Sequence, residues 1–319
     1  MIRILHSKPD YTEKFTSMSE MRTITPGEIP VKDFHEFLLG SVAPRPIAFV
    51  STLDANGVPN LAPYSFYNAF SSNPPIVVFS SNRRVVNNTT KDTLQNIQDS
   101  GECVINSVNY AMIRQMAVAS VEFPGDVNEF DKTGLTPVES MLVKPFRVKE
   151  SPVHLECRVR EVITLGDKGG AGHLVICDVL RMHVSESVID EKNRIDPHKI
   201  DLMGRMGRAY YVRASGAAVH TIVQPVTRMV IGYDALPESI RSSHVLSANH
   251  LGLLAGLFAI PDDAKMEEIS DMQQVAELLV PGAPLESIHE LAARWLEEGK
   301  REEAGALLFL ADKRRANKI

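Results

Sequence analysis

The sequence has few cysteines, no long apolar run and no excess of basic residues, and each absence excludes a class of protein. Only three cysteines (Cys103, Cys157 and Cys177) occur among 319 residues. This odd, widely spaced set favours buried free thiols over a disulfide framework. The longest apolar stretch, residues 251–260, is interrupted by glycines and is too short to cross a bilayer. A formal net charge of −6 argues against a broad nucleic-acid surface.

Targeting signals and common catalytic motifs are also missing. Residues 1–15 contain no apolar core of the kind found in secretory signals, so we expect a cytoplasmic protein with no membrane or nucleic-acid partner. The patterns HExxH, CxxC and GxSxG do not occur. His154 and Glu156 share one face of a predicted strand while Cys157 lies on the other, so the three cannot converge on a metal ion. We predict no metal site and no catalytic side chain.

The first two-thirds of the chain are rich in predicted strands. The composition, 44% apolar and 23% charged, is that of a globular protein with one substantial core and room for a smaller unit. Strands are expected over residues 46–52, 58–66, 76–80, 103–108, 153–164 and 173–184. Short helices are expected over 32–39, ending at Gly40, and from the N-cap Asp92, with Gln95 in the reciprocal capping position, to Gly101. Without regular strand–helix alternation, the pattern predicts an antiparallel barrel.

The last part of the chain has a helical pattern. Apolar residues recur at helical spacing over residues 245–260, 263–279, 285–298 and 301–315. These segments predict an all-α C-terminal unit over residues 243–319. Residues 293–304 resemble a single helical-repeat hairpin, which we interpret as ordinary helix packing, with a partner-binding site as the alternative.

Residues 42–66 combine two short predicted strands with many prolines and hydroxyl groups. Prolines in a sheet are confined to edges, first residues and bulges. Segments such as Pro44-Arg45-Pro46 and Asn60–Ser65 are therefore poor candidates for the interior of a sheet. The pattern favours a flat polar ligand lying against the exposed backbone.

Residues 80–93 have the features of a phosphate-binding segment. A helix N-terminus offers free N–H groups and a partial positive charge to an anion. Lys91 adds a point charge, Arg83 can bind two oxygens at once, and Ser81 and Thr93 add hydroxyls. The alternative is a solvated loop followed by an ordinary helix cap.

Several motifs in a fixed order carry a resemblance to a known family. They are PRPIAFVST (44–52), the Asn56-Gly57 turn, NLAPYSF (60–66), NPP (73–75) and KDTLQNI (91–97). Together they resemble the flavin reductase-like FMN-binding split-barrel family over about residues 29–212. Residues 153–157 and 206–211 look like later landmarks of the same family.

The resemblance implies a homodimeric, mainly β protein: an antiparallel split β-barrel over residues 25–215, with added helices, that binds FMN near the dimer interface. The helical unit after residue 243 departs from the compact family domain. By match to the motifs, the residues from Arg45 to Ser65 in the set below would contact the isoalloxazine and ribityl groups, and those from Ser80 to Thr93 would contact the phosphate. The implied FMN-binding residues are Arg45, Pro46, Ser51, Thr52, Asn60, Ala62, Pro63, Tyr64, Ser65, Ser80, Ser81, Arg83, Lys91, Asp92 and Thr93.

The same resemblance implies a function. We expect an FMN-dependent oxidoreductase in which NADH or NADPH, as a transient reductant, passes a hydride to the flavin and a second acceptor takes the electrons. The acceptor would be a small molecule or a redox partner protein. Because the flavin supplies the difficult chemistry, no acid–base pair is needed in the sequence. The alternatives are a non-enzymatic FMN-binding electron-transfer protein whose helical tail docks a partner, and a barrel that has lost its cofactor.

Overall fold

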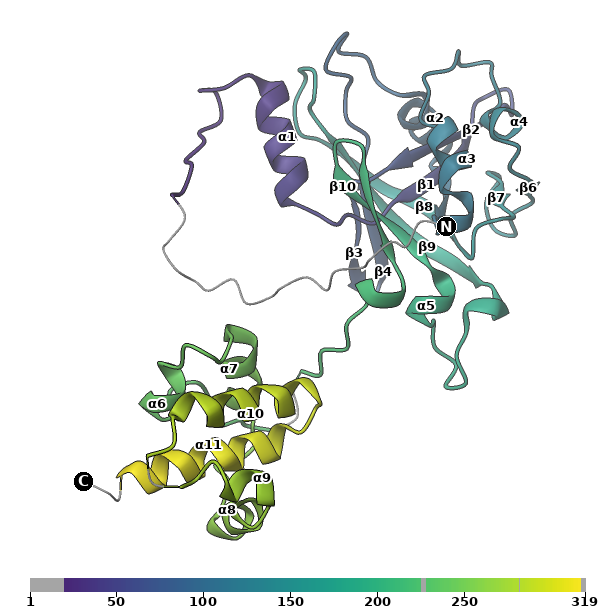
Figure 1. The fold of residues 1–319 in the computed structure, drawn as a ribbon. Coiled ribbons are helices and arrows are strands. Elements are labelled where there is room, and N and C mark those ends of the chain that lie inside the picture. Colours follow the sequence, from purple (N-terminus) through teal and green to yellow (C-terminus); the bar gives the residue numbers. More distant parts are fainter. Residues whose placement is uncertain (1–19, 225–227, 281, 317–319) are drawn as a thin grey trace, which may run out of the picture. The chain divides into compact units, whose positions relative to one another are not determined.

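The computed structural model describes residues 20–224, 228–280 and 282–316 of the chain. The chain divides into two compact units, with the boundary between Thr221 and Ile222. The first unit comprises residues 23–221 and is built around a sheet (Figure 1). The second contains the described residues from 222 onward and is helical. The described residues between 222 and 242, which the sequence leaves between the two predicted domains, belong to the helical unit.

The first unit contains a seven-stranded sheet in which every neighbouring pair of strands is antiparallel. The strands lie in the order β2-β1-β5-β8-β9-β4-β3. Their bounds are β1 (Ala48–Leu53), β2 (Pro59–Tyr64), β3 (Tyr67–Ser72), β4 (Pro75–Ser80), β5 (Glu102–Ser107), β8 (Val153–Thr164) and β9 (His173–Val184). The two central strands, β8 and β9, cover the ranges that the sequence predicts for them.

The two edge strands of this sheet are consecutive in the sequence. β2 and β3 lie at opposite ends of the strand order, yet only Ser65 and Phe66 join them. The Phe66 carbonyl also accepts a hydrogen bond of 2.8 Å from the Ser80 N–H at the end of β4. Because so short a connection brings the edges together, the sheet curls into a barrel that is split between β2 and β3. The predicted antiparallel split barrel is confirmed, although the single strand predicted over 58–66 ends at Tyr64 and β3 was not predicted.

The barrel core contains all three cysteines. Cys103, Cys157 and Cys177 are free and buried on neighbouring strands, with Sγ of Cys103 and Sγ of Cys177 3.9 Å apart. The Cys157 thiol raises the pKa of Cys103, the Cys103 thiol raises the pKa of Cys177, and burial adds to both shifts, so that both pKa values lie well above the ordinary value. These thiols are therefore uncharged packing groups.

A second apolar cluster lies on the other face of β1. There Phe49 and Leu61 pack with Met112, Met116 and Phe130 from the chain that follows β5. β1 is thus buried on both faces, which explains its uninterrupted apolar start.

The helices and turns of this unit are α1 (Val31–Ser41), α2 (Asp92–Ser100), α3 (Ile113–Val118), α4 (Glu129–Thr133) and α5 (Pro197–Ile200), with the 3₁₀ turns Tyr110–Met112, Glu186–Val188 and Gly216–Ala218. Two small hairpins complete it: β6 (Pro137–Val138) with β7 (Arg147–Val148), and β10 (Leu202–Gly207) with β11 (Tyr210–Ala214).

Two predicted helix ends differ from the structure. α1 continues through Gly40 to Ser41. At α2 the N-cap residue is Lys91, with extended backbone, and no side chain caps the helix; the predicted capping box of Asp92 and Gln95 was wrong. Gln95 instead donates a hydrogen bond to Asp99 along the helix. α2 ends as predicted at Gly101, whose φ of 68° is a left-handed conformation that favours glycine.

The helical unit is built around two long neighbouring helices, α10 and α11 (Figure 1). Its helices are α6 (Glu238–Arg241), α7 (Ala248–Ala255), α8 (Asp263–Ser270), α9 (Gln273–Ala276), α10 (Leu285–Glu297) and α11 (Arg301–Ala316). The core includes Trp295 and Leu307, together with Leu236 and Ile240 from the segment before residue 243. The C-terminal helical unit is thus present, and α10 and α11 match their predicted ranges closely.

Two predicted helices of this unit are shorter than expected. The segment 245–260 is helical only over α7, since Ser247 caps its start through a capping box with His250. The segment 263–279 is interrupted between α8 and α9 because Met272 has an extended backbone, with ψ of 126°. Among the described residues, no helix is long and apolar enough to cross a membrane.

Candidate functional site

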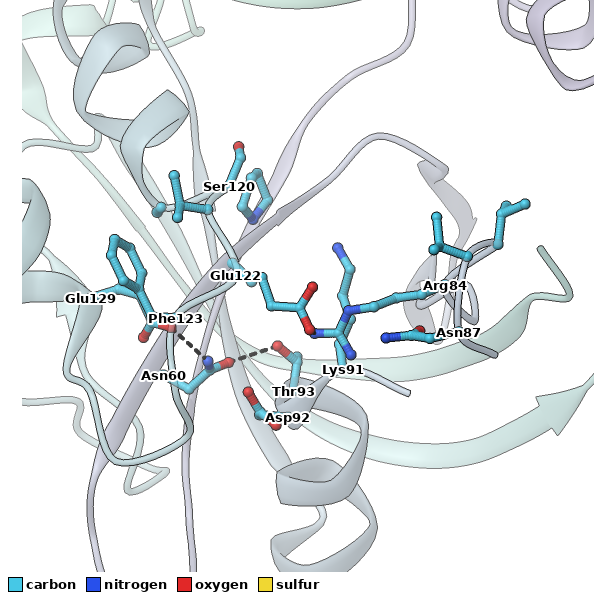
Figure 2. Close-up of a pocket in the computed structure, with 16 residues that line it drawn as sticks. Asn60, Arg84, Asn87, Lys91, Asp92, Thr93, Ser120, Glu122, Phe123 and Glu129 are labelled. Atoms are coloured by element: carbon cyan, nitrogen blue, oxygen red, sulfur yellow. Dashed lines mark hydrogen bonds and ion pairs between the residues drawn. The ribbon is translucent and has the colours of Figure 1, made fainter. Parts of the chain in front are cut away.

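A cavity of the barrel unit lies where β2, the start of α2 and two loops meet (Figure 2). Its volume is about 560 Å³, within the range of small-molecule sites. Six of the predicted FMN-binding residues line it: Asn60, Ala62, Pro63, Lys91, Asp92 and Thr93. Residues that were not predicted complete the lining: Arg84, Val85, Val86, Asn87, Ala119, Ser120, Val121, Glu122, Phe123 and Glu129.

The β2 side of the cavity is a strand edge. Among the described residues β2 pairs with β1 alone, so its other edge faces α4 and the cavity instead of another strand. Pro59 and Pro63 have no N–H to donate, which removes part of the pairing capacity of that edge. The prolines that make the sequence unsuitable for a sheet interior therefore lie on an edge strand beside the cavity.

A buried carboxylate connects this edge to the rest of the site. Glu129, at the start of α4, accepts hydrogen bonds from the Leu61 N–H (3.0 Å) and from Nδ2 of Asn60 (3.1 Å). Burial raises the pKa of Glu129, and the hydrogen bond from Leu61 opposes that rise. Oδ1 of Asn60 in turn accepts a hydrogen bond of 2.7 Å from the Thr93 hydroxyl. Figure 2 shows this line of contacts from Glu129 through Asn60 to Thr93.

The opposite side of the cavity contains two cations. The Lys91 ammonium lies 4.6 Å from the ring centre of Tyr64 and makes no hydrogen bond or ion pair with any residue that the structure describes. Burial lowers the pKa of Lys91, and the charge of Arg84 lowers it further, while that of Glu122 raises it. Nη2 of Arg84 lies 3.1 Å from Oε1 of Glu122. A small cluster of charges, Arg84, Lys91 and Glu122, therefore lies on one wall (Figure 2).

Three hydroxyl groups of the predicted residues are buried without a hydrogen-bonding partner among the described residues, and none of the three lines the cavity. They are Oγ of Ser51, Oη of Tyr64 and Oγ of Ser81. Burial raises the pKa of the Tyr64 phenol to about 12, although the nearby Thr93 and Ser81 hydroxyls act in the opposite direction. The wall formed by Arg84 and Lys91 suits a ligand that carries a negatively charged group such as a phosphate. FMN, with its ribityl hydroxyls and phosphate, meets this description.

The remaining predicted residues do not line the cavity, and their contacts explain why. Arg45 is 5% exposed, and its Nη1 donates to the Leu39 and Val42 carbonyls at the end of α1, both at 2.6 Å. Ser65 lies 3.5 Å from Nε of the same arginine. Arg83 binds Asn88 through Nε and Nη2, and its neighbour Arg84 lines the cavity instead. The other predicted residues outside the cavity lining are Pro46, Ser51, Thr52, Tyr64, Ser80 and Ser81.

Some of these residues support the cavity from behind. Thr52 is buried and accepts a hydrogen bond of 3.0 Å from Nδ2 of Asn96 in α2, which fixes α2 against β1. Ser80 donates to Oδ1 of Asn82 at 2.7 Å. The roles proposed for these side chains in FMN binding stay predictions.

The sequence did not indicate the residues of the 119–123 segment or Glu129. Glu129 lies 69 positions from Asn60, so no local motif connects them. Arg84 is adjacent to Arg83 in an irregular loop, where no periodicity tells which side chain faces the cavity.

A second polar cluster, outside the cavity, is structural. Glu156 is fully buried and accepts hydrogen bonds from the Met141 and Leu142 N–H groups at 2.9 and 2.6 Å. Nε2 of His183 lies 2.7 Å from Oε1 of Glu156. The carboxylate thereby holds residues 141–142 against β8. Within residues 20–224, 228–280 and 282–316, no group of three or more His, Cys, Asp or Glu residues is arranged to hold a metal ion.

Comparison with known proteins identifies relatives of the barrel unit. Residues 39–202 match the family model described as "Flavin reductase like domain". The structure is similar to nitrilotriacetate monooxygenase component B from Bacillus cereus, with 31% identity, a TM-score of 0.59, and coverage of 62% of this chain and 98% of the other. It is also similar to 2-nitrobenzoate 2-nitroreductase NbaA from Pseudomonas fluorescens, with 27% identity, a TM-score of 0.54, and coverage of 63% and 96%.

A third solved structure bears on the fold alone. A split-barrel protein from Shewanella frigidimarina NCIMB 400, described as a flavin reductase, aligns with 23% identity and a TM-score of 0.53, covering 61% of this chain and 95% of the other. In all three comparisons the neighbour is covered almost completely, and about two-fifths of this chain lies outside the alignment.

Proposed function

Because the chain belongs to the flavin reductase-like domain family, we propose that it is an FMN-dependent oxidoreductase that uses NADH or NADPH as reductant and passes the electrons to a second acceptor. The bound flavin supplies the hydride and electron chemistry. The protein supplies binding, orientation and a defined place for the phosphate. The observation that carries the proposal is the cavity itself, where an edge strand, the start of α2 and two cations meet.

The residues of the cavity have separate tasks in this proposal. The backbone of β2 around Ala62 and Pro63 provides a flat wall for the ring system. Thr93, held through Asn60 by Glu129, presents a hydroxyl of fixed orientation. Lys91 and Arg84 attract the phosphate, and because Lys91 is partly withdrawn from water its charge is only weakly screened.

The test is a spectroscopic one. Purified protein is reconstituted with FMN, freed of excess cofactor, and treated with NADH or NADPH without oxygen. We expect bound flavin to absorb blue light. One of the nicotinamides should bleach this absorption band, and an added acceptor should restore it. Failure to bind FMN contradicts the proposal.

The second candidate function is a non-enzymatic FMN-binding electron-transfer protein. The observation in its favour is the helical unit, which lies largely outside the alignments with the solved structures. In this candidate function the helical unit docks a partner protein. Bound flavin that neither nicotinamide bleaches would favour this candidate.

The homodimer stays a prediction, for which the exposed Val31, Phe37 and Leu38 of α1 offer an apolar surface.

A further inference from the structure

The cavity lining contains carboxylates that oppose the attraction of its two cations for a phosphate. Two cations, Arg84 and Lys91, are accompanied by three carboxylates, Asp92, Glu122 and Glu129. A phosphate monoester carries a charge of about −1.5 to −2 at neutral pH. A carboxylate that stays beside the two cations weakens their attraction for such a group.

The contacts of the three carboxylates show which one can withdraw. Glu129 is 6% exposed and is held by the Leu61 N–H and by Asn60. Asp92 belongs to the first turn of α2 and forms no ion pair with the described residues. The Glu122 side chain is 61% exposed, and its ion pair is with Arg84. Glu122 can therefore turn into solvent without breaking a buried contact.

The position of Glu122 is also where a phosphate would be held. Its carboxylate faces the Arg84 guanidinium, with the Lys91 side chain beside them (Figure 2). Arg84 is anchored from behind, since its Nη1 donates to the Thr89 hydroxyl (2.8 Å) and the Thr90 carbonyl (2.6 Å). The guanidinium is thus held in place while its Nη2 is paired with an exposed carboxylate. A carboxylate and a phosphate oxygen are equivalent acceptors for this group.

We propose that the Glu122 carboxylate competes with the phosphate of the flavin for Arg84 and Lys91, so that Glu122 sets the affinity for phosphorylated over unphosphorylated flavins. This inference rests on the proposed function. It makes Glu122 a specificity-determining residue that weakens retention of FMN and favours its release.

The test compares Glu122→Gln with the wild-type protein, using FMN and riboflavin as probes. Riboflavin has the same ring and ribityl chain but no phosphate. We expect Glu122→Gln to bind FMN about two- to five-fold more tightly, the range set by exposed ion pairs, and to bind riboflavin as the wild type does. The dissociation constants are measured by quenching of flavin fluorescence at low ionic strength.

Two controls make the result specific. Glu139→Gln removes one exposed carboxylate of the barrel unit outside the cavity, and we expect no change with either flavin. In an Arg84→Ala background, Glu122→Gln should change the FMN dissociation constant much less, because the guanidinium for which the carboxylate and the phosphate compete is absent.

Three outcomes overturn the inference: unchanged FMN affinity in Glu122→Gln, an equal change for FMN and riboflavin, or an equal gain in Glu139→Gln. If the wild-type protein binds neither flavin, the proposed function fails and the inference with it. That result differs from failure of the inference alone, in which the wild type binds FMN normally.

Discussion

At the scale of the residue, two adjacent arginines differ in what they can bind. Arg83 is occupied by the side chain and carbonyl of Asn88, whereas Arg84 lines the cavity and faces Glu122. The motifs of the sequence led to Lys91 and Thr93, because the residue types at the start of a helix form a recognisable pattern. They led to Arg83 and not to Arg84, since the direction of a side chain in an irregular loop depends on contacts made by distant residues.

Alanine substitutions should separate the two arginines. Arg84→Ala and Lys91→Ala each remove a charged donor from the cavity, and we expect each to weaken FMN binding by about tenfold or more, as for hydrogen bonds to charged groups. Arg83→Ala should change the FMN dissociation constant by less than about threefold. Flavin fluorescence titrations provide the measurement. An Arg83→Ala effect equal to that of Arg84→Ala would place the phosphate outside the cavity described above.

At the scale of the element, the site depends on a contact between a strand edge and a short helix. α4 has only five residues, too few to be stable alone, and Glu129 fastens it to β2. The strands β8 and β9 were predictable because alternation extends over twelve residues in each. The contact of α4 with β2 was not, since its two partners are far apart in the sequence. The break between α8 and α9 was missed for a related reason: periodic apolar residues do not show where Met272 becomes extended.

Glu129→Gln tests that contact. The amide can keep one acceptor oxygen, but its NH₂ group must then face either the Leu61 N–H or the Asn60 amide. We expect a loss of about 1–3 kcal/mol in the free energy of unfolding of the barrel unit, the cost of an unsatisfied buried group, together with weaker FMN binding through displaced Asn60 and Thr93. Urea denaturation followed by circular dichroism measures the first effect. Asp131→Asn, an exposed change in the same helix, is the control; an equal loss there would contradict the assignment.

At the scale of the whole molecule, the chain combines a barrel unit with a separate helical unit. The segment before residue 243 was not assigned to either predicted domain, because the one helix among its described residues, α6, has four residues. Leu236 and Ile240 nevertheless belong to the helical core. A cut made from the sequence alone, before Ser243, would expose these side chains.

The two units offer a truncation experiment with a built-in optical probe. A variant that ends at Thr221 should fold and keep FMN affinity within about threefold, because the cavity and its hydrogen bonds lie wholly in residues 23–221. A variant that ends at Ser242 should be more prone to aggregation. The single tryptophan, Trp295, lies in the helical core, so its fluorescence in the full chain follows only the helical unit. Loss of FMN binding on truncation at Thr221 would mean that the helical unit contributes to the site.

The short link between the two edge strands has a consequence for how the barrel forms. β2 and β3 are neighbours in the sequence, but the strands that separate them in the sheet come from as far away as β9, and β4 pairs Ile76 with Asp178. Bringing such distant strands together costs loop-closure entropy, and most of that cost arises before the pairings stabilise the sheet. The β8–β9 hairpin is local and can form early, whereas β4 must wait for it. The barrel should therefore fold slowly for its size, and the candidate site, which needs both β2 and α2 in place, should be among the last parts to form.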